Sequence, residues 1–198
     1  MKRRLFLFVF VASLLTASAP NAFAGTWTLD FSGLQNGEEV LNYYAGGFGS
    51  LGSGPGPNYG ITFTPDFVTQ MDVGPYGPGL VGVLTGTSAT MDVSGGFTGF
   101  FSFYYQDEQP PGLVTVWSGL DGTGVMLASF TLPGAGSWMP AGTAFGGDAM
   151  SVVFSGTPGI LYDPITDAGL VIPEPSSLLL LGTGLAGLAA AFLRRMVS

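Results

Sequence analysis

The stretch FTGFFSFYY, which runs from Phe97 to Tyr105, places a large aromatic side chain at alternate positions along much of its length. In an extended chain Phe97, Phe101, Phe103 and Tyr105 fall on one side, because successive side chains of a β-strand point to opposite faces. This spacing has the period of two residues that is typical of strands, and not the period of 3.6 that marks a helix. The stretch therefore predicts a β-strand with one buried aromatic face.

Short apolar runs of the same kind recur along the middle of the chain, each bounded by the turn-forming residues Gly, Pro, Asn or Asp. They are found at Thr26–Phe31, Ile61–Phe67, Leu80–Leu84, Leu113–Trp117, Met126–Leu132, Met150–Phe154 and Gly159–Tyr162. About ten short strands with no helical segment between them predict an all-β fold, an antiparallel β-sandwich of jelly-roll-like form. We expect two glycine-rich stretches, Gly46–Gly60 and Gly134–Gly147, to be long loops.

The middle of the chain is acidic and contains no cationic residue. Of the thirteen Asp and Glu residues only Glu174 lies outside residues 25–172, which leaves twelve carboxylates there with no Lys, Arg or His. This charge excludes nucleic acid as a partner, because binding to phosphates depends on Lys and Arg. The absence of His, Cys and Lys also removes the usual general base, thiolate nucleophile and imidazole metal ligand. We therefore expect no enzymatic activity.

Glycoside hydrolysis is the one chemistry that carboxylates alone could support, and it needs two facing groups about 5 to 10 Å apart. The pairs Glu38-Glu39 and Asp107-Glu108 are sequence neighbours, so in a strand their side chains would point to opposite faces. Both pairs are more typical of solvated turns. A carboxylate-only glycoside hydrolase is therefore a less favoured alternative than a non-enzymatic protein.

Residues 1–24 have the three parts of a secretory signal peptide. The basic segment Lys2–Arg4 precedes the apolar segment Leu5–Leu15, and Ala22 and Ala24 form a small-residue cleavage signal before Gly25. Eleven apolar residues would make a helix of about 16 Å, too short for a hydrocarbon core of about 30 Å. The sequence predicts an exported protein whose mature chain begins at Gly25, and the absence of Cys means that it folds without disulfides.

A second apolar segment, residues 176–193, contains no charged residue and would rise about 27 Å as a helix, enough to span a bilayer. Arg194 and Arg195 follow it, and the positive-inside rule places them on the cytoplasmic side. Residues 172–175 are held extended by two prolines and should be accessible above the membrane. We expect a signal peptide at 1–24, a β-sandwich outer domain at 25–171 and a sorting segment at 172–198.

The order Pro173-Glu174-Pro175, apolar helix and terminal Arg194-Arg195 resembles the PEP-CTERM sorting signal. The resemblance implies a protein exported by a Gram-negative bacterium and cut at or beside the Pro-Glu-Pro motif by a membrane-embedded exosortase. It also implies an association with exopolysaccharide production and biofilm, which is common among proteins that carry this signal.

The outer domain shows a second resemblance. Leu29-Asp30-Phe31, Gly60-Ile61-Thr62-Phe63 and the segment Ile160–Ile165 are similar to the opening and closing strands of many PEP-CTERM outer domains, which resemble carbohydrate-binding sandwiches. This resemblance implies a structural calcium ion at Asp163, and no other cofactor is expected. Trp138, within the glycine-rich segment 134–147, is the candidate surface aromatic residue for stacking on a sugar.

Together these observations favour a non-enzymatic protein of the cell surface or extracellular matrix. Before processing it would be anchored in the inner membrane, and afterwards its mature domain would be periplasmic, surface-bound or extracellular. Its expected partners are an exosortase-like processing enzyme, the membrane and a polysaccharide. The alternative is a dedicated carbohydrate-binding module, which would be recognised by measurable affinity for a defined glycan.

Overall fold

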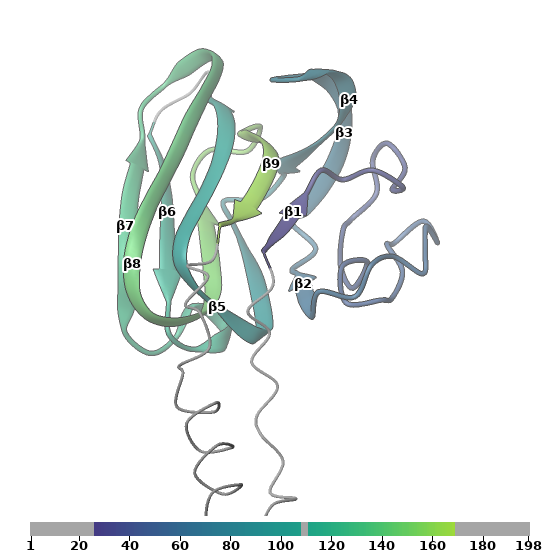
Figure 1. Ribbon diagram of the computed structural model, residues 1–198. Helices are drawn as coiled ribbons and strands as arrows, with labels where there is room; N and C mark the ends of the chain where they lie inside the picture. Colours follow the sequence, from purple (N-terminus) through teal and green to yellow (C-terminus); the bar gives the residue numbers. More distant parts are fainter. Residues whose placement is uncertain (1–25, 108–110, 169–198) are drawn as a thin grey trace, which may run out of the picture.

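The computed structural model describes residues 26–107 and 111–168, which form nine β-strands and one 3-10 turn (Figure 1). The elements are β1 (Trp27–Leu29), β2 (Ile61–Phe63), β3 (Phe67–Gly74), β4 (Gly77–Leu84), β5 (Ser88–Asp107), β6 (Gly112–Trp117), η1 (Leu120–Gly122), β7 (Met126–Leu132), β8 (Ala135–Ser155) and β9 (Leu161–Asp167). Every strand pair is antiparallel, which confirms the predicted all-β antiparallel fold. No helix within these two ranges is long and apolar enough to cross a membrane.

The two longest strands, β5 and β8, pair with each other and organise the fold, with a shift of register after Asp92. Before this irregularity, β5 lies between β2 on one side and residues 151–155 of β8 on the other. These residues of β8 also pair with β6, and β6 pairs with β7. Beyond it, residues 97–107 of β5 lie between β9 and residues 135–149 of β8. β9 also pairs with β1 and β4, and β4 pairs with β3. A bulge that bends a strand lets β5 and β8 contribute to both halves of one sheet.

The two halves of the sheet face each other across an aromatic core. The ring of Phe103 lies 5.5 Å from that of Phe130 and 6.2 Å from that of Phe154, measured between centroids. Phe103 belongs to the half that contains β9, whereas Phe130 and Phe154 belong to the half that contains β6 and β7. Because rings from both halves meet in the interior, the fold is a β-sandwich, as predicted.

Residues 97–105 form a strand with one buried aromatic face, as their period-two pattern predicts. Phe97, Phe101, Phe103 and Tyr105 are buried in the core, with at most 4% of each side chain exposed. The alternate positions on β5 face away from this core and are more exposed. Three of these alternate positions, Phe100, Ser102 and Tyr104, form the floor of the groove described below.

The structure corrects the prediction for Gly134–Gly147, which lies almost entirely within β8 and is not a loop. Pairing with β5 supplies the backbone hydrogen bonds that offset the entropic cost of several glycines. The run Ile61–Phe67 is likewise two strands and not one, since β2 ends at Phe63 and β3 begins at Phe67, with Pro65 in the turn between them. The predicted long loop at Gly46–Gly60 is confirmed.

The expectation that Glu38 and Asp107 lie in solvated turns is wrong. Glu38 is fully buried, and Asp107, at the end of β5, is only 2% exposed. The carboxylate of Glu38 accepts hydrogen bonds from the backbone amides of Gln35, Leu51 and Ser53 at 2.7, 2.9 and 3.0 Å. These amides take the place of the cation that the domain lacks.

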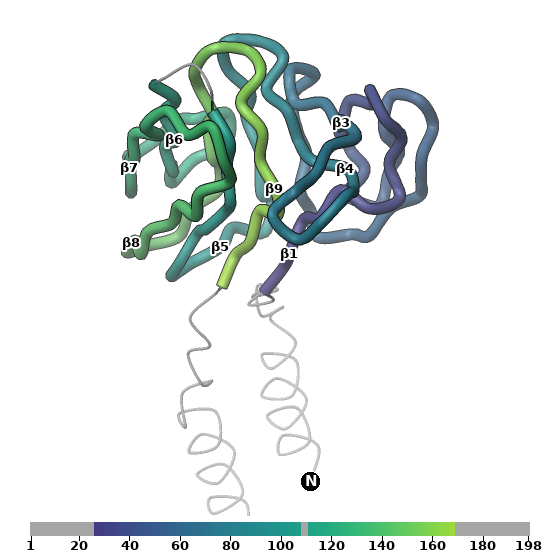
Figure 2. The backbone as a smooth tube through the Cα atoms, turned by 90° about the horizontal axis from the view of Figure 1, so that it is seen from above, coloured from purple at the N-terminus to yellow at the C-terminus, as the bar shows by residue number. Residues whose placement is uncertain are grey.

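The two ends of the described chain leave the sandwich at the same place. Trp27 in β1 lies opposite Asp167 in β9 in the strand register. Figure 2 shows the start of β1 and the end of β9 side by side. The segments before residue 26 and after residue 168 therefore join the sandwich at one end.

Candidate functional site

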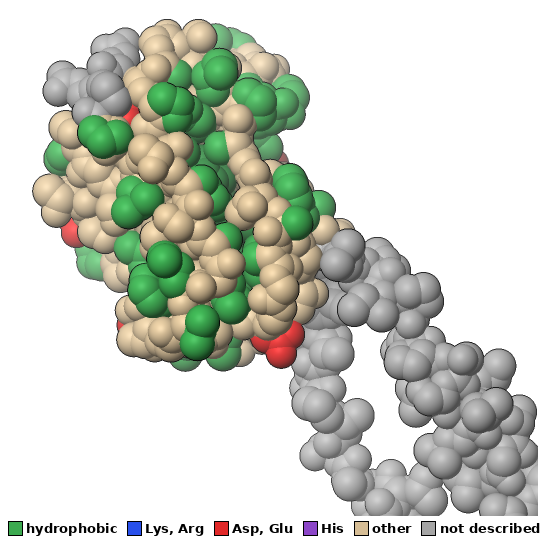
Figure 3. Space-filling view, turned by 90° about the vertical axis from the view of Figure 1, so that its left-hand side faces the viewer, with side chains coloured by type: hydrophobic (Ala, Val, Ile, Leu, Met, Phe, Trp, Pro, Cys, Tyr) green, Lys and Arg blue, Asp and Glu red, His purple; other side chains and the backbone are tan. Residues whose placement is uncertain are grey.

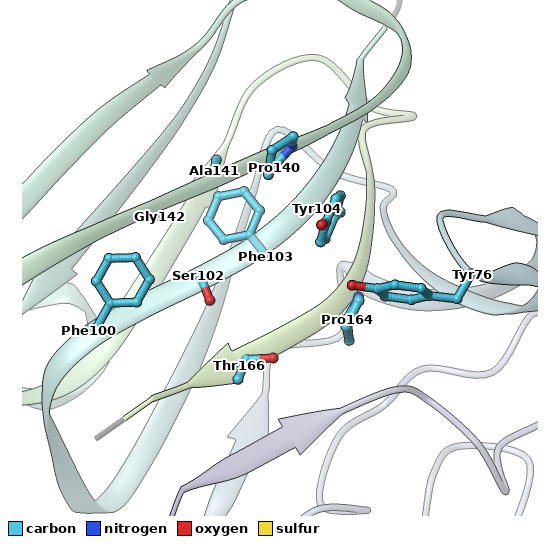
Figure 4. Close-up of a pocket in the computed structure, with 10 residues that line it drawn as sticks. All are labelled: Tyr76, Phe100, Ser102, Phe103, Tyr104, Pro140, Ala141, Gly142, Pro164 and Thr166. Atoms are coloured by element: carbon cyan, nitrogen blue, oxygen red, sulfur yellow. The ribbon is translucent and has the colours of Figure 1, made fainter. Parts of the chain in front are cut away.

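A groove of about 380 Å³ lies on the outer face of the half-sheet formed by β5, β8 and β9 (Figure 4). It is lined by Tyr76, Phe100, Ser102, Phe103, Tyr104, Pro140, Ala141, Gly142, Pro164 and Thr166. These residues provide ring faces and hydroxyl groups, and none of them is charged. The groove therefore suits an uncharged ligand that has both apolar faces and hydroxyl groups.

Strand β5 supplies the floor of the groove through three alternate residues, Phe100, Ser102 and Tyr104. They share one face because side chains alternate along a strand, and their neighbours Phe101, Phe103 and Tyr105 point into the core on the opposite face. The Phe100 side chain is 37% exposed. The same alternation thus produces the buried core and an aromatic surface behind it.

Gly142 of β8 allows the side chains of β5 to lie close to the neighbouring strand. A Cβ atom at this position would stand 2.8 Å from Cβ of Ser102 and 3.0 Å from Cζ of Phe100. Because the first distance is shorter than side-chain atoms normally approach, any larger residue here would displace Phe100 or the backbone. The glycine therefore sets the shape of the groove at this point.

Tyr76, from the turn between β3 and β4, forms the outer rim. Its ring meets that of Tyr104 edge to face, with centroids 5.7 Å apart at 73°. A hydrogen bond with the Tyr104 side chain, together with slight desolvation and nearby negative charge, raises the pKa of Tyr76 above its ordinary value. The Tyr76 side chain is 75% exposed, so most of this ring is available to a ligand.

Asp163 lies next to this rim and is partly buried. Its Oδ2 atom is 2.8 Å from the position that a Cβ of Gly74 would occupy, which places the carboxyl against the end of β3. Burial, and to a lesser extent the negative charge of Asp30, raise the pKa of Asp163 to about 7. Within residues 26–107 and 111–168 no three His, Cys, Asp or Glu side chains come together as a metal site, so calcium at Asp163 stays a prediction.

Replacing Asp163 with Asn is expected to stabilise the protein at alkaline pH and to have little effect in acid. A folded-state pKa above the unfolded value of 3.8 means that ionisation at high pH opposes folding, and this penalty disappears as the pH falls from about 7 toward 4. Thermal unfolding of Asp163→Asn and the parent protein should therefore differ most at pH 8 and converge near pH 4. A difference that is independent of pH would contradict this cause, and Asp148→Asn serves as an exposed control.

Trp138 lies in β8 and not in a loop, and it is half-buried. Its indole Nε1 donates a hydrogen bond of 2.8 Å to the carbonyl oxygen of Val73, and its ring packs on the small cluster of Val81, Val83 and Leu161. Much of this side chain is therefore occupied by contacts within the domain. A ligand-binding role for Trp138 stays a prediction, and the exposed rings of the groove are better placed for one.

Sequence reasoning did not single out Tyr76 or Phe100. The signal for Phe100 was present, because the face of residues 97–105 opposite the core also carries large rings. Tyr76 gave no such signal, since its approach to Tyr104 depends on where the β3–β4 hairpin ends relative to β5.

The remaining predicted site residues lie outside the described residues: Ala22, Ala24, Pro173, Glu174, Pro175, Arg194 and Arg195. Residues 171–195 match the family model described as the PEP-CTERM protein-sorting motif. The chain carries a PEP-CTERM sorting motif. This motif indicates an exported protein that is sorted through a membrane, and it confirms the resemblance seen at Pro173-Glu174-Pro175.

No curated protein matches the chain. Among solved structures it is similar to the K2 cleaved adhesin domain of Lys-gingipain, with 13% identity and a TM-score of 0.47 over 73% of this chain and 99% of that one. It is also similar to the family 11 carbohydrate-binding module of a cellulosomal cellulase from Clostridium thermocellum, with 15% identity and a TM-score of 0.41 over 74% and 95%. A glycoside hydrolase family 43 arabinoxylan arabinofuranohydrolase from Bacillus subtilis gives 20% identity and a TM-score of 0.42 over 55% of this chain and 26% of the enzyme. Likenesses this distant carry no argument about function.

Proposed function

We propose that this chain is a non-enzymatic protein of the cell surface or extracellular matrix. In this proposal the signal peptide at 1–24 directs export, the helix at 176–193 anchors the precursor in the inner membrane, and an exosortase-like enzyme cuts at or beside residues 173–175. The observation that carries the proposal is the match of residues 171–195 to the PEP-CTERM protein-sorting motif. The domain at 25–171 is what sorting would deliver.

The arrangement of the described ends supports this proposal. Trp27 and Asp167 lie opposite each other in paired strands, so a leader before the domain and an anchor after it both join at one end of the sandwich. The β3–β4 turn with Tyr76 is formed by another part of the fold, and the groove runs from it along β9 to Thr166, next to the residue that ends the strand. Processing near residue 173 would thus leave the folded domain intact, because β9 ends at Asp167.

The composition of the groove supports a role without catalysis. Its lining contains no carboxylate, and residues 25–172 contain no His, Cys, Lys or Arg to act as base, nucleophile or cation. Among the described residues Asp92 and Asp121 lie close enough for their side chains to share a hydrogen bond. A glycosidase pair must be several ångströms apart to hold a sugar between its two members.

Mass determination of the protein recovered from its native host tests the proposal. We expect a mature N-terminus at Gly25 and a C-terminus close to residues 173–175. Material that retains Arg195 throughout would contradict sorting by cleavage. Retained residues 1–24 would contradict export by a cleaved signal peptide.

The groove favours a second function, binding of a polysaccharide by the outer domain. Tyr76, Phe100 and Tyr104 present ring faces on which the apolar face of a sugar could stack, and Ser102 and Thr166 provide hydroxyl groups between them. Because no cation lines the groove and the domain is acidic, a neutral glycan fits it and an anionic one does not. Association with exopolysaccharide or biofilm would follow from such binding.

Replacing Tyr104 with Ala is expected to weaken glycan binding about ten-fold, which corresponds to about 1.4 kcal/mol of binding free energy. The variant removes a ring of the groove and the edge-to-face partner of Tyr76. Isothermal titration calorimetry against a panel of neutral and anionic glycans would measure the affinity of the parent protein and of the variant. Tyr59→Ala, which removes an exposed ring in the 46–60 loop, is the matched control. Equal losses in both variants, or binding confined to anionic glycans, would contradict a site in the groove.

A further inference from the structure

One side of the sandwich is bounded by two strand edges that have no partner strand in the described part of the chain. Strand β7 pairs with β6 alone, and residues 135–149 of β8 pair with β5 alone. Both edges lie at the left of Figure 1, and Figure 3 shows this side face on. Below we call it the open side, defined by β7 and residues 135–149.

The core is incompletely covered at the open side. Seven half-buried apolar residues of the described ranges pack against the main core, and six of them belong to β7 or to residues 135–149 of β8. These six are Leu127, Ala128, Phe130, Ala135, Ala141 and Phe145. Elsewhere the sandwich encloses its core more fully, so burial of further apolar surface is still available at this side.

The open side is also uncharged. Residues 122–147, which include β7 and most of the β8 edge, contain no Asp, Glu, Lys or Arg, although the domain as a whole is strongly acidic. Figure 3 shows apolar side chains spread across this face and acidic side chains only near its margins. A neutral apolar surface fits neither a cationic nor an anionic partner, but it is complementary to another surface of the same kind.

The opposite edge of the sheet, β3, is covered by another segment of the same chain. Residues 36–40 run along it: the Gly37 amide donates to the Thr69 carbonyl at 2.7 Å, and the Val40 amide donates to the Phe67 carbonyl at 3.1 Å. The chain thus covers this edge with its own backbone, which prevents pairing with another strand. No described segment covers β7 in this way.

We propose that β7 pairs antiparallel with β7 of a second copy of this chain. β7 has seven residues and neither Pro nor a charge, so it lacks the features that usually protect an exposed edge. The β8 edge is interrupted by Pro140, which has no amide hydrogen, and is the poorer template. A second copy is the occupant that the surface fits, because a two-fold contact joins identical neutral patches and keeps the acidic faces apart.

A two-fold axis at Ser129 gives this pairing its simplest register. Ser129 then faces Ser129 of the other copy, and Ala128 of each copy lies opposite Phe130 of the other. The axis is perpendicular to the strand and inverts one copy, so the ends at residues 26 and 168 of the two copies point in opposite directions. If the proposed anchoring is correct, released copies can pair in this way, whereas copies standing side by side in one membrane cannot.

Disulfide trapping can test the pairing without interference, because the chain contains no Cys. Residues directly opposite each other in antiparallel strands have Cα atoms about 4.5 to 5.5 Å apart, within the range that a disulfide spans. We expect the full chain with Ser129→Cys, purified in detergent micelles and mildly oxidised, to form a covalent dimer on a non-reducing gel. Ser88→Cys, at an exposed serine in β5 of the same half-sheet, is the matched control and should stay monomeric.

A lysine at the same position provides a second measurement on the otherwise unaltered chain. Ser129→Lys places two positive charges opposite each other. We therefore expect the dissociation constant of the dimer, measured by sedimentation, to rise about ten-fold or more, and we expect Ser88→Lys to leave it unchanged. A dimer trapped equally by both cysteines would indicate association through other segments and would overturn the proposal. Absence of trapping at Ser129 would overturn it too, since it would mean that this chain's own flanking segments or nothing at all cover β7. Because detergent frees the copies to turn over, these results do not depend on processing at residues 173–175.

Discussion

Replacing Glu38 with Ala is expected to lower the free energy of unfolding by about 3 kcal/mol, because hydrogen bonds to a charged group contribute about 1.5 to 3 kcal/mol each. The Glu38 carboxylate is fully buried and joins three separate backbone amides, those of Gln35, Leu51 and Ser53. Its loss would leave these donors without a partner in the middle of the long loop between β1 and β2. Water that enters the loop would satisfy some of these amides. We therefore expect the loss of stability to correspond to about one or two such bonds and not to all three.

The pH dependence of this variant identifies the cause. Burial acts to raise the pKa of Glu38, but hydrogen bonds from the Ser53 side chain and from the backbone amides of Gln35, Ser53 and Leu51 outweigh it and leave the pKa below 4.5. A lowered folded-state pKa means that the carboxylate stabilises the fold at pH above the unfolded value, and that this contribution is lost as the pH falls through the folded value.

Urea unfolding at pH 7 and at progressively lower pH would measure both effects. The difference between the parent and Glu38→Ala should be largest near neutral pH and shrink in acid. Glu39→Ala is the matched control, because Glu39 is the neighbouring carboxylate and is only partly buried. An equal loss in the two variants would show that loop charge in general, and not the buried carboxylate, is responsible.

The sequence was sufficient to predict the fold class because the period-two pattern is local. Residues 97–105 alternate between core and surface as their spacing requires, and the antiparallel sandwich follows from many such runs. The pattern failed at Gly134–Gly147 because composition there favours a loop while a long-range partner, β5, favours a strand. Strand pairing depends on residues far apart in the chain, which a single stretch of sequence does not reveal.

The candidate site was less predictable for the same reason. The sorting motif is a short contiguous signal, so residues 173–175 could be recognised directly. The groove combines Tyr76, Tyr104 and Thr166 from three separate strands and turns, and it exists only once their register is fixed. Glu38 was misjudged because neighbouring carboxylates usually mark solvent, and nothing in the sequence shows that the loop folds its amides around one of them.

Replacing Phe67 with Ala is expected to cost about 4 kcal/mol of unfolding free energy, within the range of about 3 to 5 kcal/mol for removal of a buried aromatic ring. Phe67 begins β3 and is fully buried. Its ring centroid lies 4.7 Å from that of Phe63, 5.3 Å from that of Phe154 and 5.8 Å from that of Tyr162. One side chain thus connects β2, β3, β8 and β9, so the cavity left by its removal would be lined by rings from both halves of the sandwich.

The size of the loss should depend on how well the cavity can close, which separates this prediction from a simple loss of apolar surface. The space is bounded on another side by Gly82, where a Cβ would overlap Cε1 of Phe67, so the backbone of β4 already lies against the ring. Since β4 is held by β3 and β9, it cannot move in to fill the space.

We therefore expect Phe67→Leu, which restores part of the volume, to recover more than half of the loss of unfolding free energy measured in urea. Phe48→Ala, which removes a ring that is 55% exposed, should change stability little. If Phe67→Leu were as unstable as Phe67→Ala, the contacts between rings, and not the filled volume, would hold the two halves of the sandwich together.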